Sequence, residues 1–255
     1  MNAKPQHLLN GNRAIRVAKQ LLKEVGLTIS RVDERASMHN WTACLNIFKE
    51  RLSPKTVFDI GIGEGTPELY SVYPNAFYFL IDPTRESLPH TRRIAQQVHA
   101  EILNLALGEE ERSVEIEVRP DDIGASSLFE EVPALTGIRR YIVPMRRFDG
   151  VVGAFERPAF CKIDVQGAEL QVLRGMGTRI DEIDAFLIEI STIATVRNGP
   201  EADEVIALLS DRGFVIYDIL SLNRRPLDSA LAQLDVLFVN RNAPMRSDRR
   251  WRLST

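Results

Sequence analysis

Hydrophobic and polar positions follow one pattern over the first fifty residues and another over the remainder of the chain. In the first part, apolar side chains recur every three or four positions, which is typical of amphipathic helices. One stripe covers residues 15–25 and ends at Gly26, and a second covers residues 41–52 and is stopped by Ser53-Pro54. Both stripes predict helices. These helices either pack on the main domain or form a lid or dimer arm, and the pattern leaves that choice open.

From residue 56 onward, short apolar runs alternate with helical patterns. This alternation predicts a parallel or mostly parallel sheet covered by helices. The last two runs are joined by a loop with little helical pattern, which predicts a final strand antiparallel to its neighbour. The predicted strands cover residues 56–60, 76–81, 100–106, 159–165, 185–190, 214–219 and 234–239, and the predicted helices cover residues 85–98, 167–176 and 200–212.

A different pattern lies in the middle of the chain. Residues 112–118 alternate polar and apolar side chains, which predicts a strand with one exposed face, and residues 141–145 are a candidate for another. Residues 121–137 between them are rich in Asp, Gly, Ser and Pro. A loop of that length inside a compact domain is usually functional or disordered. Ser126 and Ser127 of this loop are therefore candidates to close over a bound ligand.

Composition narrows the class of protein. The chain has 255 residues, 44% of them hydrophobic, which is enough for one large domain with a sizeable core. A net charge of −3 argues against a general nucleic-acid binder. Two cysteines support neither a disulfide scaffold nor a thiolate zinc site. No apolar run approaches the roughly 20 residues that span a bilayer, and none resembles a signal peptide. We therefore expect a soluble cytoplasmic protein that contacts neither nucleic acid nor membrane.

The strongest local signal is the glycine-rich stretch FDIGIGEGTP at residues 58–67. It directly follows a predicted strand, and Pro67 suits the first turn of a helix. Glycines allow the backbone to approach a ligand closely, and the start of the helix presents free N–H groups. Open α/β sheets bind nucleotide-like ligands at this position.

The residues around the glycines favour one kind of ligand. A dinucleotide fingerprint needs a third glycine where Thr66 stands. Asp59, just before the loop, would repel a pyrophosphate but attract a cation, and S-adenosylmethionine (SAM) carries a sulfonium and an ammonium group. Asp82 ends the next predicted strand, where an acid can bind ribose hydroxyls. The alternative for Asp82 is ordinary turn chemistry, since Pro83 follows it.

These residues resemble the FkbM-type methyltransferases, a branch of the class I SAM-dependent enzymes. The resemblance covers roughly residues 56–239. It implies the class I (Rossmann-like) fold, with a seven-stranded, mostly parallel sheet, helices on both faces and an N-terminal helical extension. It also implies SAM as methyl donor, S-adenosylhomocysteine as product and, often, a hydroxyl acceptor on a sugar or natural product. The motifs that carry it are FDIGIGEGT, IDP, LALG, SSL at 126–128, KIDVQGAELQVLRGM at 162–176 and LIEI at 187–190.

Three positions depart from the family pattern. The family usually has Glu at positions 82 and 166, where this chain has Asp82 and Gln166, and it often has Asn where Glu64 stands. Asp in place of Glu keeps the ribose chemistry, whereas Gln166 removes a possible acid. The predicted domains are a helical extension at 1–53, a methyltransferase domain at 54–240 and a basic tail at 241–255.

Methyl transfer to a hydroxyl needs alignment of the reacting atoms and a base for the hydroxyl proton. Asp164, at the end of the predicted strand 159–165, is the candidate base or substrate contact. The alternative is that it caps the following helix. Lys162 should pair with an acid, for which Glu189 is a candidate, and Glu189 is also expected to line the acceptor pocket. Glu169 is either a helix N-terminal acid or a site residue.

The sequence thus predicts a SAM-dependent O-methyltransferase that acts on a sugar or a small natural product. The alternatives are an NAD-dependent oxidoreductase and a non-catalytic adenosyl-binding protein of the same fold. The four histidines have no metal-pair spacing, so no metal ligand is predicted, and a metal requirement stays open. The N-terminal helices are candidates for a homo-oligomer contact. The predicted cofactor-binding residues are Asp59, Gly61, Gly63, Glu64, Thr66, Asp82, Pro83, Leu105, Ala106 and Asp164, and the predicted catalytic residues are Asp164 and Glu189.

Overall fold

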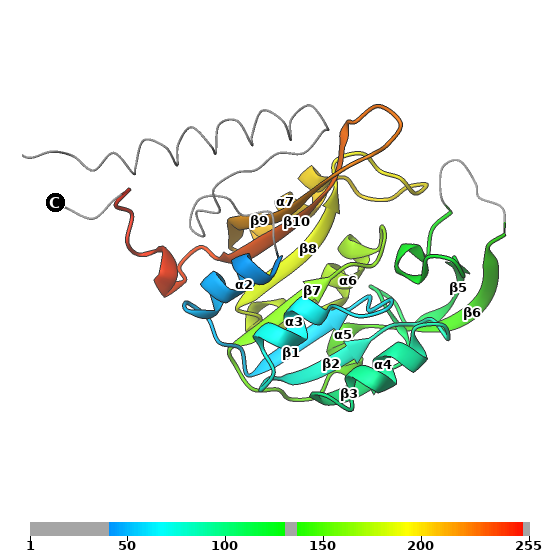
Figure 1. The fold of residues 1–255 in the computed structure, drawn as a ribbon, viewed down its shortest axis with the longest axis horizontal. Coiled ribbons are helices and arrows are strands. Elements are labelled where there is room, and N and C mark those ends of the chain that lie inside the picture. Colours follow the sequence, from blue (N-terminus) through cyan, green and yellow to red (C-terminus); the bar gives the residue numbers. More distant parts are fainter. Residues whose placement is uncertain (1–40, 131–136, 252–255) are drawn as a thin grey trace, which may run out of the picture. The chain divides into compact units, whose positions relative to one another are not determined.

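The computed structural model describes residues 41–130 and 137–251. Its centre is a seven-stranded sheet with the strand order β3-β2-β1-β7-β8-β10-β9 (Figure 1). All neighbouring pairs are parallel except those of β10, which runs antiparallel to both β8 and β9, so the predicted antiparallel final strand is confirmed. The strands are β1 (Thr56–Ile60), β2 (Phe77–Ile81), β3 (His99–Leu103), β7 (Ala159–Ile163), β8 (Ala185–Ser191), β9 (Phe214–Arg224) and β10 (Leu231–Asn240).

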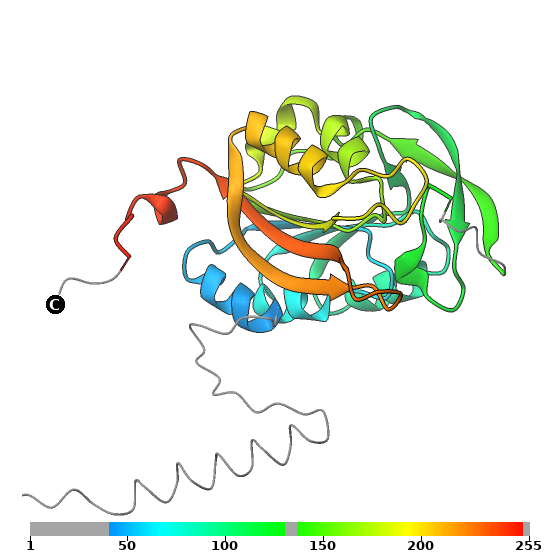
Figure 2. The same ribbon diagram turned by 90° about the horizontal axis from the view of Figure 1, so that it is seen from above.

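Helices cover both faces of this sheet. Figure 2 shows α2 and α3, in blue and cyan, on one face and α6 and α7, in yellow-green and orange-yellow, on the other. Because both faces are covered, every residue of β1 and of β7 is buried, including the charged side chains of Asp59 and Lys162. The helices are α2 (Trp41–Lys49), α3 (Pro67–Val72), α4 (Leu88–Ile94), α5 (Phe148–Val151), α6 (Glu169–Gly175) and α7 (Ala202–Asp211), with 3-10 turns η1 (Ile123–Ala125), η2 (Gly177–Glu182) and η3 (Pro244–Arg246).

A second, three-stranded sheet lies beside the main one. Its strands β4 (Ala106–Leu107), β5 (Arg112–Val118) and β6 (Arg139–Arg146) have the order β4-β6-β5. The predicted strand 100–106 is therefore wrong as a single element, because its residues divide between β3 and β4. Asn104 lies at the break, where its side-chain amide donates to the carbonyl oxygens of Asp82 at 2.8 Å and Thr84 at 3.2 Å. The break brings β4 to the edge of the sheet that carries the glycine loop.

The predicted helix 41–52 is confirmed as α2, and it packs on the main domain. The Phe48 ring lies 6.0 Å from the Phe160 ring of β7 and 5.6 Å from the Tyr217 ring of β9. Lys49 donates a hydrogen bond of 2.6 Å to the carbonyl oxygen of Val72 at the end of α3. The other predicted helix, over residues 15–25, lies outside the described residues. None of the helices in the described ranges is long and apolar enough to cross a membrane.

Candidate active site

Two glycines of the loop after β1 are required by the path of the backbone. Gly61 has a φ of +77°, and a Cβ atom there would lie 1.7 Å from the carbonyl oxygen of Asp164. Gly63 has a φ of +54°, and its Cβ would lie 3.1 Å from the Cα of Gly124. Side chains at these positions would be strained and would displace neighbouring backbone. The loop after β1 therefore lies directly against the segment after β7 and against η1.

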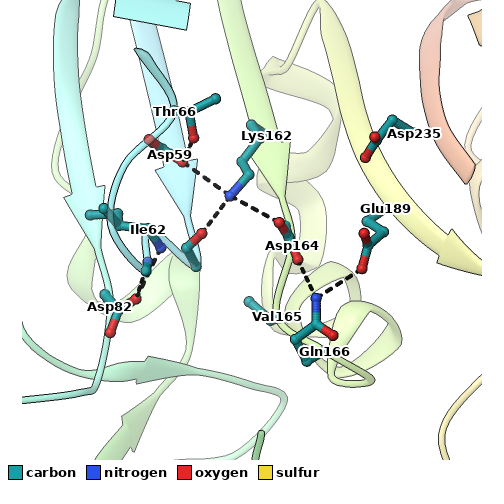
Figure 3. Close-up of polar contacts among 12 residues, drawn as sticks. Asp59, Ile62, Thr66, Asp82, Lys162, Asp164, Val165, Gln166, Glu189 and Asp235 are labelled. Atoms are coloured by element: carbon teal, nitrogen blue, oxygen red, sulfur yellow. Dashed lines mark hydrogen bonds and ion pairs between the residues drawn. The ribbon is translucent and has the colours of Figure 1, made fainter. Parts of the chain in front are cut away.

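Asp82 at the end of β2 holds this loop in place (Figure 3). Its Oδ2 accepts hydrogen bonds from the backbone N–H groups of Ile62 at 2.9 Å and Gly63 at 3.0 Å. Its Oδ1 accepts from the Thr84 amide, the Thr84 hydroxyl and the Ser87 hydroxyl at 2.8, 2.6 and 2.7 Å. A carboxylate offers about four lone-pair sites, so a ribose hydroxyl must replace one of these donors. That Asp82 binds the ribose stays a prediction. The hydrogen bonds show that Asp82 anchors the glycine loop.

Asp59 lies beneath the loop and is paired with a buried lysine. Lys162 Nζ lies 3.4 Å from Asp59 Oδ1 and 3.6 Å from Asp164 Oδ2, and it also donates to the Gly61 carbonyl (Figure 3). The Asp59 side chain is fully buried and also accepts hydrogen bonds from the Tyr70 and Thr66 hydroxyls. Burial alone would lower the Lys162 pKa, but Asp164 and Asp59 raise it. Lys162 therefore already balances the negative charge of Asp59, which is the charge expected to attract a cationic ligand.

The pairing of Lys162 corrects one expectation. Glu189 was the candidate partner for this lysine, but the structure pairs Lys162 with Asp59 and Asp164. Glu189 instead accepts hydrogen bonds from the side-chain amides of Gln166 at 2.8 Å and Gln233 at 2.7 Å. The sequence predicts Lys162 and Glu189 on adjacent strands. It does not show that Asp59, on β1 at the other side of β7, has its carboxylate 3.4 Å from the Lys162 ammonium group.

A cavity opens above the carboxyl ends of β1, β2 and β7. Its empty volume is about 620 Å³, including the solvent-open mouth. It is bounded on one side by the predicted cofactor residues Gly61, Gly63, Asp82, Pro83, Leu105, Ala106 and Asp164. Three other predicted residues are not part of its lining. Asp59 and Thr66 are buried behind the loop, and Glu64 is exposed to solvent.

Residues 123–128, between β5 and β6, cover part of this cavity. Ile123 and Gly124 of η1, together with Ser126 and Leu128, belong to its lining. Ser127 forms an antiparallel bridge with Glu117 of β5, and its hydroxyl donates a 2.6 Å hydrogen bond to the carbonyl oxygen of Gln166. Ser126 therefore lies at a cavity and Ser127 is not part of its lining, and closure of this loop over a bound ligand stays a prediction.

On the other side of Asp164 lies a group of carboxylates. The Gln166 amide donates to Asp164 Oδ1 at 2.7 Å and to Glu189 Oε1 at 2.8 Å (Figure 3). Asp235 of β10 accepts hydrogen bonds from Ser221 of β9 and, at 3.1 Å, from the Trp41 indole. Residues from three strands and from α2 therefore meet at this edge of the sheet. Asp235 was missed. A charged residue in an otherwise apolar predicted strand singled out Lys162, and Asp235 shows the same pattern.

The carboxyl groups on this side hold protons more tightly than usual. Burial raises the pKa of Glu189 to about 8, and Asp164 and Asp235 add to the increase. Burial also raises the pKa of Glu169 to about 7 and that of Asp235 above its ordinary range. Groups that titrate near neutral pH can accept and release protons during a reaction.

Asp164 does not cap the helix that follows it. The N-cap residue of α6 is Ala168, and Glu169 accepts the N–H groups of Gly167 at 3.0 Å and Val165 at 3.4 Å. The capping alternative for Asp164 is therefore wrong, and Glu169 closes this turn instead. The Asp164 side chain is 32% exposed and lines the cavity. Within residues 41–130 and 137–251, no three His, Cys, Asp or Glu side chains are arranged to hold a metal ion.

Comparisons with known proteins give a family and several structural likenesses. Residues 46–216 match the family model of the methyltransferase FkbM domain, starting inside the segment predicted as an extension. No curated protein matches the chain. Similar solved structures include magnesium protoporphyrin IX methyltransferase from Synechocystis PCC 6803 with bound SAM, at 11% identity and a TM-score of 0.44, covering 94% of this chain and 86% of that one. A Burkholderia thailandensis 1,6-didemethyltoxoflavin-N1-methyltransferase shares 15% identity with a TM-score of 0.44, covering 94% and 92%.

Proposed function

Because the chain belongs to the methyltransferase FkbM domain family, a family of SAM-dependent methyltransferases, we propose that it methylates a hydroxyl group of a sugar or a small natural product. Family membership removes the NAD-dependent oxidoreductase alternative. Asp164 carries the proposal for a hydroxyl acceptor, because it lines the cavity and is joined through Gln166 to a second carboxyl group. A hydroxyl must lose its proton during transfer, and a carboxylate at this position can take it.

The donor side would hold SAM between the glycine loop and the ends of β2 and β4. Leu105 and Ala106 offer an apolar surface to the adenine, and Asp82 is placed for the ribose once a Thr84 or Ser87 hydroxyl gives way. When bound, SAM supplies a methyl group already activated on a positively charged sulfur. The protein therefore has to orient the acceptor oxygen in line with the methyl carbon and sulfur, and to exclude water.

The acceptor side would manage the proton. Asp164 would accept the proton of the acceptor hydroxyl as the methyl group passes from the SAM sulfur to the acceptor oxygen, so that a methyl ether and S-adenosylhomocysteine would be the products. Glu189, with a pKa of about 8, carries a proton at neutral pH and can donate a hydrogen bond to the acceptor. The two carboxyl groups thus have different tasks because their surroundings differ.

The proposal is tested by an acceptor screen with SAM that carries a tritiated methyl group. We expect label to enter hydroxyl-bearing saccharides or small natural products. Asp164→Asn should lower the rate on the order of 100-fold or more, while calorimetry shows unchanged binding of S-adenosylhomocysteine. Labelling of amine acceptors alone, or full turnover by the Asp164→Asn enzyme, would overturn it.

The cofactor side is tested separately. Asp82→Ala removes the acceptor for two loop N–H groups, so we expect binding of S-adenosylhomocysteine to weaken roughly 10- to 100-fold in calorimetry. Asp228→Ala is the control, since Asp228 lies in the β9–β10 turn with Arg225. Equal affinity of the Asp82→Ala protein and the wild type would show that neither the ribose contact nor the loop contact of Asp82 supports cofactor binding.

A further inference from the structure

Gln166 occupies an unusual position in the turn between β7 and α6. Its φ is +50°, a left-handed conformation that few residues other than glycine, Asn and Asp adopt readily. Its side-chain amide uses one nitrogen to reach two carboxyl groups, Asp164 at 2.7 Å and Glu189 at 2.8 Å. In Figure 3 the amide lies between the two carboxyl groups, of which Asp164 directly follows β7 and Glu189 lies on β8. The backbone conformation therefore serves to place this amide.

The other end of the same residue is attached to the segment that covers the cavity. The Gln166 carbonyl accepts a 2.6 Å hydrogen bond from the Ser127 hydroxyl. Ser127 also accepts the Phe129 N–H at 3.0 Å and exchanges backbone hydrogen bonds with Glu117, so the hydroxyl is held firmly. Neighbours of Ser127 on both sides, Ser126 and Leu128, line the cavity. A ligand that presses on the segment thus acts on Gln166 through one hydrogen bond.

We propose that Gln166 is a positioning residue that connects the segment covering the cofactor cavity, residues 123–128, with the two acceptor-side carboxyl groups. When the segment settles on the cofactor, Ser127 fixes the Gln166 backbone, and the amide then sets the spacing of Asp164 and Glu189. The inference rests on the proposed function for which side binds the cofactor and which binds the acceptor. The hydrogen bonds that join Ser127, Gln166 and the two carboxyl groups are present in the chain without ligands.

The titration of Glu189 reports on this connection. Glu189 faces Asp164 and Lys162 from β7, Glu169 from α6 and Asp235 from β10. An amide N–H donated to a carboxylate favours its ionised form, so loss of the Gln166 contact should raise the pKa of Glu189 further. A residue that only filled space would leave this titration unchanged.

The experiment is an infrared pH titration of the full chain carrying isotope-labelled glutamate, with Glu189→Gln used to assign the band. Gln166→Asn tolerates the left-handed backbone but is too short to bridge, and we expect it to raise the Glu189 midpoint by about one pH unit. Ser127→Ala should raise it by less. Ser126→Ala, which removes the neighbouring hydroxyl that accepts the Arg119 N–H, should leave it unchanged. If Gln166→Asn does not fold, Gln166→Met, which keeps the length without the donor and adds no charge, should also raise the midpoint.

A second arm adds S-adenosylhomocysteine. We expect the ligand to shift the wild-type midpoint and to bind the Ser127→Ala protein without that shift. Wild-type midpoints in both Gln166→Asn and Ser127→Ala would overturn the inference while leaving the proposed function intact. Failure of the wild type to bind S-adenosylhomocysteine would overturn the proposed function, and the ligand-free arm would still decide whether Gln166 makes the connection.

Discussion

The two sides of the candidate site handle charge in opposite ways. On the donor side, Asp82 is satisfied by hydrogen-bond donors of the protein, and Asp59 is paired with Lys162. On the acceptor side, Glu189 and Asp235 meet amides, hydroxyls and an indole, and their pKa values are raised. On the donor side both buried carboxylates thus have protein partners before any ligand arrives, whereas on the acceptor side burial raises the pKa values of Glu189 and Asp235.

This difference shows how one sheet edge can bind a cofactor and manage a proton. A buried charge costs less when it is paired and hydrogen-bonded than when it is left without a partner. Buried carboxyl groups without a full counter-charge hold their protons up to neutral pH and become useful for acid–base chemistry. Lys162 stands at the border, since it pairs with Asp59 on one side and Asp164 on the other.

The largest expected effect comes from the backbone contact that joins the two sides. Gly61→Ala would put a Cβ 1.7 Å from the Asp164 carbonyl oxygen, so we expect destabilisation above about 4 kcal/mol and loss of detectable binding of S-adenosylhomocysteine. Gly137→Ala is the matched control, because Gly137 has a similar φ of +82° but nothing within 4 Å of its Cβ position. It should cost only about 1–2 kcal/mol. Urea unfolding and calorimetry measure both. Similar losses in the two variants would show that strain, not contact, makes Gly61 necessary.

The next effect comes from the border lysine. Lys162→Met leaves Asp59 buried without its counter-charge, and we expect a loss of about 3–5 kcal/mol in urea unfolding. Arg157→Met removes the exposed partner of Asp184 and should cost less than about 1 kcal/mol. A loss for Lys162→Met no larger than for Arg157→Met would mean that the donor side does not depend on charge balance.

The smallest effect concerns the acceptor side and depends on pH. Glu189 has a folded pKa of about 8 against an ordinary value of 4.5, so the folded state binds more protons in this interval and stability falls as pH rises through it. Glu189→Gln removes this dependence. Its stability relative to the wild type should increase by about 1–3 kcal/mol from about pH 5 to about pH 8 in urea unfolding. Exposed Glu115→Gln should change nothing. Parallel stability curves for Glu189→Gln and the wild type would refute the raised pKa.

Helices and strands with a clear hydrophobic periodicity were predicted from the sequence, whereas side-chain contacts between elements far apart in the sequence were not. The glycine loop and Asp82 follow predicted strands and Asp164 lies at the end of one, and they line one cavity because parallel strands bring their carboxyl ends to one edge. The division of residues 100–106 between two sheets was missed, although Asn104 interrupts the apolar run, because periodicity does not show where a strand changes partner. The bridging role of the Gln166 amide was missed because it depends on the backbone turn at that residue.

The sequence alone determined the fold class, the family and the position of the glycine loop, because these follow from short-range periodicity and from motifs read along the chain. Only the tertiary structure decided which charges meet. Lys162 lies on β7 between β1 and β8, and whether it pairs with Asp59 or Glu189 depends on side-chain direction and on distances of a few ångströms across the sheet. Those distances decide that Asp59 meets a lysine, whereas Glu189 meets the side-chain amides of Gln166 and Gln233.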